Sequence, residues 1–186
     1  MSSVLGPLLK RLDEMLRGQG LPVVDHWAPP APSGDVAMAL QSLGMEPHPD
    51  VQTVFSWHNG FIASDDYLSY TITPTGVTPI SLNQAIEDGY EQTTAIAECA
   101  LPGWFPVFEQ SGGWTTVDCR PDSPHPGAVR SWIYGEINDV ADSLAEVITW
   151  FLEFYEQGHW TWRRPGWDGT VPPEILTQRQ LSSGLF

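Results

Sequence analysis

Histidine and cysteine are the residue types of this sequence best suited to hold a metal or to act as a nucleophile, and their spacing favours neither role. None of the five histidines pairs with another four positions away across a glutamate, the spacing that places two zinc ligands on one helix face. The two cysteines, Cys99 and Cys119, are too few for a disulfide framework or a zinc-ligand set, and their apolar neighbours indicate packed side chains. We therefore expect no metal and no cofactor, although a metal site built from histidines distant in the sequence stays open.

A glycine pair raises the question of a phosphate-binding loop. It lies in the segment GWFPVFEQSGGWTTVDC, Gly103 to Cys119, between two short runs of aromatic and β-branched residues. A phosphate loop needs a strand before it and a helix N-terminus after it, because the amides at the start of the helix hold the anion. Here the run after the glycines alternates with the period of a strand, so we interpret the pair as the bend of a β-hairpin.

Nucleophiles and paired acids give no catalytic pattern either. The sequence has no G-x-S-x-G motif, which would place a serine at a strained strand-to-helix turn. The adjacent acids Asp65-Asp66 and Glu87-Asp88 are typical of a solvated face. A hydrolase would need a nucleophile, a base and an orienting group, which these residues do not supply. We therefore expect that the chain is not an enzyme.

The composition indicates a globular protein with a strongly acidic surface. The 186 residues suit one domain with appendages, and 41% of them are hydrophobic. Eight basic against 23 acidic residues give a formal net charge of −15, which repels nucleic acid and anionic membranes and attracts basic proteins. We expect a basic protein partner; an acidic surface kept for solubility is the alternative that composition leaves open.

The N-terminal segment does not resemble a targeting signal. It lacks the basic start and long apolar core of a secretion signal, and no apolar run approaches the roughly 20 residues that cross a bilayer. We expect a cytoplasmic protein that does not bind membranes.

The predicted organisation has four parts: an N-terminal amphipathic helix in residues 1–20, a proline-rich linker in 21–34, an α+β domain in 35–158 and a C-terminal tail in 159–186. Leucines at helical spacing indicate the first helix, which Gly20 ends. We expect its apolar stripe to dock on the main body rather than on a membrane, because its polar face carries few cations.

Short helices are expected in the first half of the domain. They lie in residues 35–43, from Pro49 to Asn59-Gly60, and from Ser81 to about Cys99. Proline in a first helical turn needs no amide donor, and Asn-Gly tolerates the positive φ that closes a helix. Ser81 and Gln84 have the spacing of a capping box. Residues 65–72 suggest a loop followed by an edge strand.

The second half of the domain predicts a meander of antiparallel strands and a closing helix. The three strands are expected at 104–108, 114–119 and 128–134. Pro106 cannot donate to a ladder, so its strand should lie at an edge, and residues 109–113 should form a five-residue hairpin loop. Ser143 and Glu146 have capping-box spacing before an apolar stripe that Gly158 ends.

Three of the nine tryptophans lie in the tail. Trp160, Trp162 and Trp167 stand close to Arg163 and Arg164. Exposed aromatic side chains there could stack on a sugar or anchor a protein partner. Alternatively, the tail folds back and buries them.

The order of these parts resembles the SUKH superfamily, which includes fungal cell-wall-assembly regulators and many bacterial immunity proteins. Four segments carry the resemblance: HPDVQTVFSWHNGF, PISLNQAIEDGY, GWFPVFEQSGGWTTVDC and GAVRSWIYGEINDVADSLAEVITWFLEFYEQG. The resemblance implies an α+β fold, in which helices pack on a twisted, mainly antiparallel sheet, and it supplies no catalytic residues. It implies that bacterial members bind and neutralise a toxin, often a nuclease. The N-terminal helix and the tail depart from a minimal member.

We therefore expect a non-catalytic protein-binding module, an immunity protein that neutralises a polymorphic toxin such as a nuclease through its acidic surface. An acidic inhibitor can occupy the basic groove of a nuclease with fast, steered association. The candidate contacts, on the sheet's exposed face and nearby loops, are Asp65, Asp66, Glu109, Trp114, Asp118 and Asp122. The alternative is a regulatory or scaffold protein linked to cell-wall synthesis, with glucan binding by the tail tryptophans as a variant.

Overall fold

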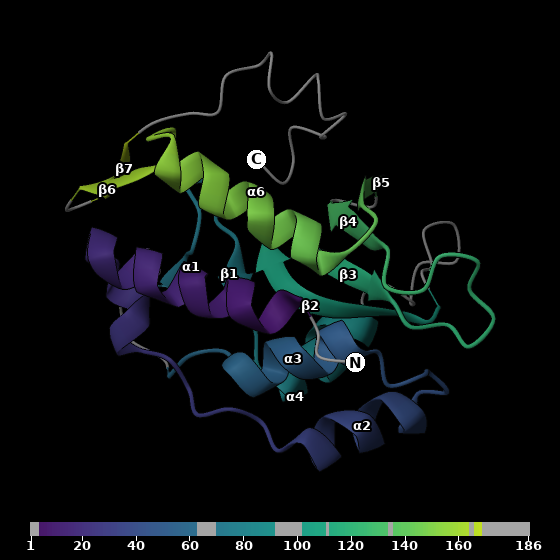
Figure 1. The fold of residues 1–186 in the computed structure, drawn as a ribbon. Coiled ribbons are helices and arrows are strands. Elements are labelled where there is room, and N and C mark those ends of the chain that lie inside the picture. Colours follow the sequence, from purple (N-terminus) through teal and green to yellow (C-terminus); the bar gives the residue numbers. More distant parts are fainter. Residues whose placement is uncertain are drawn as a thin grey trace.

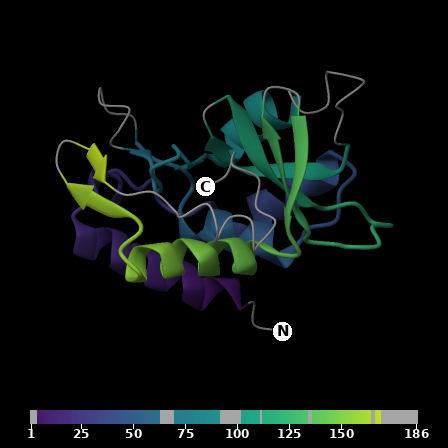
Figure 2. The same cartoon turned by 90° about the horizontal axis from the view of Figure 1, so that it is seen from above.

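The computed structural model describes residues 4–62, 70–91, 102–110, 112–133, 136–163 and 166–168. Its centre is a five-stranded antiparallel sheet in the order β1-β2-β3-β4-β5. The strands are β1 (Thr78–Pro79), β2 (Trp104–Gln110), β3 (Gly113–Asp118), β4 (Val129–Ile133) and β5 (Glu136–Ala141). Two long helices, α1 (Leu5–Gln19) and α6 (Leu144–Glu156), lie side by side on one side of the sheet (Figure 1 and Figure 2). The architecture is α+β, as predicted.

The remaining elements are short. They are η1 (Pro22–Asp25), α2 (Ser33–Ser42), α3 (Pro49–Trp57), α4 (Leu82–Gln84), the π-helix η3 (Ala85–Tyr90), β6 (Thr161–Arg163) and β7 (Gly166–Asp168). Helix α3 packs on the sheet through Phe55, whose ring meets Phe105 of β2 edge to face at a centroid distance of 6.1 Å. Within the described residues, no helix is both long and apolar enough to span a membrane.

Helix α1 confirms the predicted N-terminal helix and its docking on the main body. One leucine in each turn is buried: Leu5, Leu9, Leu12 and Leu16. Burial of a leucine side chain stabilises a fold by about 2 kcal/mol. Gly20 ends the helix with a φ of 71°, as the sequence indicated.

Residues 21–34 do not form the extended linker that their prolines suggested. Three apolar side chains of this segment are buried in the common core: Leu21, Val23 and Ala31. The Ala31 N–H donates to the Phe55 carbonyl at 2.9 Å, and Trp27 forms an antiparallel bridge with Phe61. Apolar residues between the prolines thus hold the segment on α3, so the N-terminal helix and the predicted domain share one core.

The pair Asn59-Gly60 has a different role from the predicted one. Helix α3 ends before it, since His58 is already extended with a φ of −148°. The Asn59 Oδ1 accepts a hydrogen bond from the Leu82 N–H at 2.7 Å. An ideal Cβ on Gly60 would lie 2.6 Å from the Ser81 nitrogen, which only glycine avoids. The pair therefore joins the end of α3 to the start of α4.

The predicted capping box at the start of α4 is confirmed. The Gln84 N–H donates to Ser81 Oγ at 3.2 Å, and the Ser81 N–H donates to Gln84 Oε1 at 3.4 Å. The helix continues as η3 to Tyr90. Its expected extension to Cys99 lies outside the described residues.

The edge of the sheet differs from the prediction. The edge strand expected within 65–72 is absent from Tyr70–Ile72, the described part of that range, and β1 is the first strand among the described residues. Because β1 pairs only with Phe108 and Glu109, the segment of β2 around Pro106 has no partner strand on that side among the described residues. The predicted edge position of Pro106 is thus correct for the first half of β2, and a bulge between Pro106 and Phe108 accommodates it.

The β2–β3 hairpin confirms that the glycine pair is a bend, with a tighter turn than predicted. Gln110 pairs with Gly113, so two residues rather than five separate the strands. Gly112 has the positive φ, 82°, that such a turn requires. An ideal Cβ on Gly113 would lie 1.9 Å from the Trp132 carbonyl oxygen, so β4 leaves no room for a side chain there.

Strand β5 extends the meander beyond the three predicted strands. Its sequence, EINDVA, places two polar residues, Asn138 and Asp139, side by side, and only Val140 is buried, so it lacks the regular alternation that indicated the other strands. Its pairing with β4 places Arg130 opposite Asp139.

The capping of α6 follows the predicted motif with one change. Ser143 Oγ accepts a hydrogen bond from the Glu146 N–H at 3.3 Å, as expected. The Glu146 carboxylate, however, accepts from the Asp142 N–H at 3.2 Å. The helix ends just before Gly158, which has a φ of 72°.

The described part of the tail folds back and buries two of its tryptophans. Trp160 and Trp162 are 1% and 8% exposed, and β6 and β7 form a hairpin. The half-buried Trp167 donates its indole N–H to Thr71 Oγ1 at 3.1 Å. The burial alternative is therefore correct for Trp160 and Trp162.

Candidate functional site

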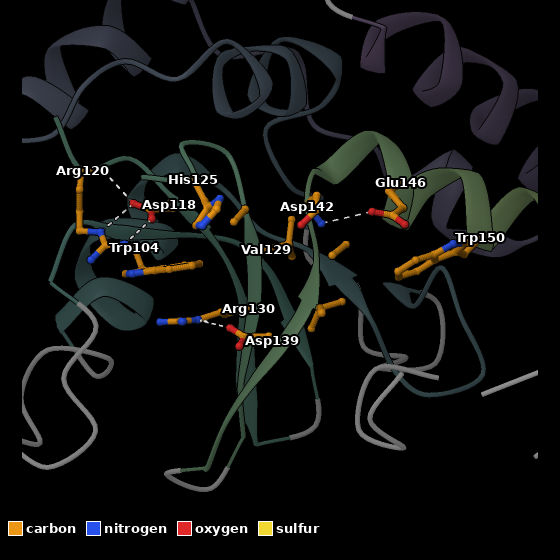
Figure 3. Close-up of a pocket in the computed structure, with 13 residues that line it drawn as sticks. Trp104, Asp118, Arg120, His125, Val129, Arg130, Asp139, Asp142, Glu146 and Trp150 are labelled. Atoms are coloured by element: carbon orange, nitrogen blue, oxygen red, sulfur yellow. Dashed lines mark hydrogen bonds and ion pairs between the residues drawn. The ribbon is translucent and has the colours of Figure 1, made fainter. Parts of the chain in front are cut away.

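A hollow of about 460 Å³ opens where β3 ends, β4 begins, β5 ends and α6 begins, and we call it the strand-end hollow (Figure 3). Pockets for small ligands measure roughly 300–1,000 Å³. One wall carries Trp104 with charged residues of β3, β4 and the loop between them. The other wall, which we call the acidic wall, carries Asp142, which precedes α6, and Glu146 and Trp150 of that helix.

Trp104 lies against two arginines. The Arg130 guanidinium carbon is 4.4 Å from the centroid of the Trp104 ring, and that of Arg120 is 5.5 Å away. Contacts of this kind contribute about 0.5–2 kcal/mol, depending on how far the cation is desolvated. The sheet register causes this arrangement. Trp104 pairs with Asp118 of β3, and Thr116, two residues earlier on the same face of β3, pairs with Arg130 of β4, so Trp104 and Arg130 lie on one face of the sheet.

Asp118 holds Arg120 in place from the interior. Its carboxylate accepts bonds from the Arg120 Nε at 2.9 Å and Nη2 at 2.6 Å, and from Ser123 Oγ at 2.6 Å. Burial alone would raise the pKa of Asp118, but the hydrogen bonds from Arg120 and Ser123 outweigh it, so the pKa lies below its ordinary value. The same bond raises the pKa of Arg120. Asp118 is therefore a buried carboxylate that positions Arg120.

Arg130 and Asp139 form a second pair with a different exposure. The Arg130 Nε donates to Asp139 Oδ1 at 2.5 Å. The Asp139 side chain is 83% exposed, whereas that of Asp118 is 1% exposed. The second pair thus lies at the mouth of the hollow.

Asp118, Ser123 and His125 have the residue types of a hydrolase triad but not its relationships. The Ser123 hydroxyl donates to Asp118, and His125 reaches Ser123 through its backbone N–H at 3.0 Å rather than through its ring. A nucleophilic serine needs the imidazole as its base. Cys119, next in the chain, is 2% exposed, and burial raises the pKa of its thiol to about 12, as expected of a packed cysteine.

The acidic wall has unmatched negative charge. Asp142 and Glu146 are both exposed, and neither forms an ion pair with a cation of the described residues. Asp139 and Asp122 add two exposed carboxylates at this end of the sheet. The arrangement can attract and hold a cation.

The structure disperses the predicted contact residues. Asp65 and Asp66 lie outside the described residues. Glu109 and Trp114 pair directly across β2 and β3 at the hairpin end, away from the hollow. Glu109 is half-buried, Trp114 is 6% exposed and Asp118 is 0% exposed.

The expectation that all of these side chains are exposed to a partner is therefore wrong for the buried ones. Trp114 and Asp118 offer almost no area to a partner in this conformation. Asp122, in the loop beside the hollow, is exposed as expected. Partner binding by any of these residues stays a prediction.

The residues that sequence reasoning missed are Arg130, Asp139, Asp142 and Glu146. The pairing of Arg130 with Asp139 depends on β5, which had no strand signal. The capping motif of Ser143 already places Glu146 in the first turn of α6. This motif is the one sequence signal that could have located an acid at this end of the sheet.

A second group of polar and aromatic side chains lies between α1, η1 and α3. His58 stacks on Trp27 at a centroid distance of 4.4 Å, and its Nε2 is 3.8 Å from Asp13 Oδ1. The Trp27 indole N–H donates to Asp13 Oδ1 at 2.9 Å. Burial lowers the pKa of His58 and outweighs the nearby Asp13. This group fixes α1 on the core.

No protein-family model matches this chain, and no curated protein matches it either. Among the described residues, no three His, Cys, Asp or Glu side chains converge as metal ligands would.

Proposed function

We propose that this protein is a non-catalytic binding module that recognises a basic protein through the acidic end of its sheet. The resemblance to the SUKH superfamily supports a narrower form of the proposal, an immunity protein that neutralises a toxin. A nuclease toxin fits best, because its groove for a polyanionic substrate is basic.

One observation carries the proposal: exposed carboxylates gather around a hollow. Asp122, Asp139, Asp142 and Glu146 are all exposed at the end of the sheet where the strand-end hollow opens. Besides the two arginines paired with Asp118 and Asp139, the hollow has an excess of carboxylates, and an excess of one sign of charge speeds association with a partner of opposite charge. The net charge of −15 extends this attraction over the whole molecule.

The test is a pull-down with the purified chain from extracts of its source cell, with and without the product of the adjacent gene. We expect a stable complex with a basic protein at low salt, and we expect it to weaken as salt increases, since ions screen charges beyond about 10 Å at 0.1 M. The absence of any stable complex at low salt would reject the proposal.

The cell-wall alternative loses one of its supports. Glucan binding would need exposed tryptophans in the tail, but Trp160 and Trp162 are buried and cannot stack on a sugar. Titration with soluble glucans, followed by tryptophan fluorescence, tests what is left of that variant, and a flat response removes it. A toxin gene beside this one would favour the immunity role, and an isolated gene would favour a scaffold.

A further inference from the structure

We propose that the outer edge of β5 binds an extended, basic segment of the partner as an added antiparallel strand of the sheet. This inference rests on the proposed function and names how that partner is held. It is carried by the unpaired edge of β5, by the exposure of its side chains and by their charge.

The two edges of the sheet differ in how far they are closed to another strand. At one edge, β1 has only two residues and includes Pro79, which has no N–H to donate. At the other edge, β5 has six residues and no proline (Figure 1). Among the described residues, β5 pairs with β4 alone. The N–H and C=O groups on its outer side therefore form a row that another strand can complete.

Strand β5 is accessible along most of its length. Glu136, Ile137 and Asp139 are exposed, and Ile137 is a large apolar residue with 39% of its surface exposed. The strand also leads to the strand-end hollow, because Asp139 and Val140 line it together with Asp142. A segment that runs along β5 thus reaches the exposed carboxylates on which the proposed function depends.

Charge determines which kind of strand fits this edge. The strand carries Glu136 and Asp139 and no basic residue. Although Asp139 already accepts a bond from Arg130, a carboxylate has about four acceptor positions, so an exposed one can take a further donor. Opposite charges across paired strands stabilise the pair, and like charges destabilise it. A second copy of the chain would bring another net charge of −15, so a basic strand fits better than a second copy.

The order of side chains on β5 sets the pattern of the added strand. Successive side chains point to opposite faces, so Ile137 and Asp139 share one face, and Glu136 and Asn138 share the other. All strand pairs described in this sheet are antiparallel, and we expect the same of the added strand. From its N-terminus it should place a basic residue beside Asp139, a polar one beside Asn138, an apolar one beside Ile137 and a basic one beside Glu136.

The test uses the ¹⁵N-labelled full chain and a hexapeptide with blocked ends, Thr-Arg-Thr-Val-Lys-Thr, which has this pattern. We expect the peptide to shift the amide signals of residues 136–141 in a saturable way. The alternate amides of β5 that point outward should exchange with solvent about tenfold more slowly near saturation. The absence of a saturable shift in β5 would overturn the inference.

Two N-methylated forms of the peptide separate strand pairing from simple charge attraction. One form is methylated on the Arg and Val nitrogens and the other on the central Thr and Lys nitrogens, so both keep the charge. In an antiparallel pair, the N–H groups of alternate residues point to the same side. We expect one form to bind about tenfold more weakly than the unmodified peptide and the other to stay within about threefold of it. Equal affinity of the two forms would show that the peptide does not bind as a strand.

Ile137→Lys tests the edge from the side of the protein. The new cation lies beside the basic strand, and we expect it to weaken peptide binding about fivefold. The matched control Ile62→Lys makes the same change at an exposed isoleucine outside the five-stranded sheet and should alter binding less than about twofold. An equal loss in the two variants would refute a site on β5. Melting temperatures show whether both variants keep the fold, and the N-methylated peptides test the native chain in either case.

Two further outcomes separate this inference from its alternatives. If the protein captured in the pull-down binds the native chain and Ile137→Lys weakens it no more than Ile62→Lys does, the strand site is wrong and the proposed function stands. If the pull-down captures no protein while the hexapeptide pairs with β5, the proposed function is wrong and the strand site stands. Protection of the β5 amides that grows with protein concentration in the absence of peptide would mean that a second copy occupies the edge, which also overturns the inference.

Discussion

Two aspartate–arginine pairs contact the same tryptophan and differ in how the protein uses them. Asp118 is 1% exposed and bonds to Arg120, Ser123 and the Arg120 backbone. Asp139 is 83% exposed and bonds to Arg130 alone among the described residues. In the first pair the carboxylate is buried and accepts several hydrogen bonds. In the second pair the carboxylate faces solvent at the mouth of the hollow.

This difference in exposure indicates that Asp118–Arg120 is a structural ion pair, whereas Asp139–Arg130 can respond to a ligand. A buried carboxylate with several donors is costly to break, because its partners lose their hydrogen bonds and cannot all regain water. An exposed pair exchanges easily with water and salt. Trp104, which is 3% exposed, therefore contacts one arginine that a buried carboxylate fixes and one that pairs with an exposed carboxylate.

The largest expected effect is that of Asp118→Ala. The change leaves the Arg120 guanidinium and the Ser123 hydroxyl without their acceptor, and we expect a loss of about 3 kcal/mol in the free energy of unfolding. Urea unfolding followed by tryptophan fluorescence measures it. A loss below about 1 kcal/mol would mean that the two pairs do not differ as described.

The pH dependence of stability should come from the same residue. Because the pKa of Asp118 is lowered in the folded state, the unfolded chain binds more protons at acid pH, so stability falls as pH falls. The contribution of Asp118 is complete above about pH 4, the ordinary value for aspartate, and is lost as pH drops through its lower folded pKa.

Unfolding measured between pH 7 and pH 3 checks this window. We expect Asp118→Asn, which cannot titrate, to be less stable at neutral pH and to depend less on pH below 4 than the native chain. Parallel curves for the two proteins would show that Asp118 is not the acid-sensitive group.

The smallest effect should be that of Asp139→Ala. The exposed pair is screened by water, and Arg130 keeps its contact with the Trp104 ring, so we expect a loss of about 0.5 kcal/mol or less. The same urea titration serves as the measurement and as the matched control for Asp118→Ala. A loss comparable to that of Asp118→Ala would refute the distinction between the pairs.

The parts of the fold that could be predicted from the sequence have short-range signals. The leucine stripe of α1, the capping boxes at Ser81 and Ser143, and the alternation in β3 each depend on residues a few positions apart. Two regions were misinterpreted because their local sequence does not indicate their packing: the prolines of 21–34 suggested an extended linker, and the irregular pattern of β5 gave no strand signal. In both cases the tertiary environment decided the structure.

The site was less predictable than the fold, because it too depends on tertiary contacts. The acidic balance and Asp122 could be found from composition, but the hollow is made by chain segments that meet only in the folded sheet. Asp118 was predicted as a partner contact because it is an acid in a strand whose outer face was expected to be exposed. Its burial depends on Arg120 and Ser123, whose hydrogen bonds no spacing rule reveals.

The packing of α1 on α6 has a consequence for how this protein folds during synthesis. Arg11 of α1 pairs with Glu156 of α6, 145 residues later in the chain. At about 5–20 residues per second, the ribosome needs roughly 7 to 30 s to make that interval. The part of α1 that packs on α6 lacks this partner throughout that time, although α3 and η1 are made earlier, so a chaperone that shields nascent apolar helices should increase the yield of native protein.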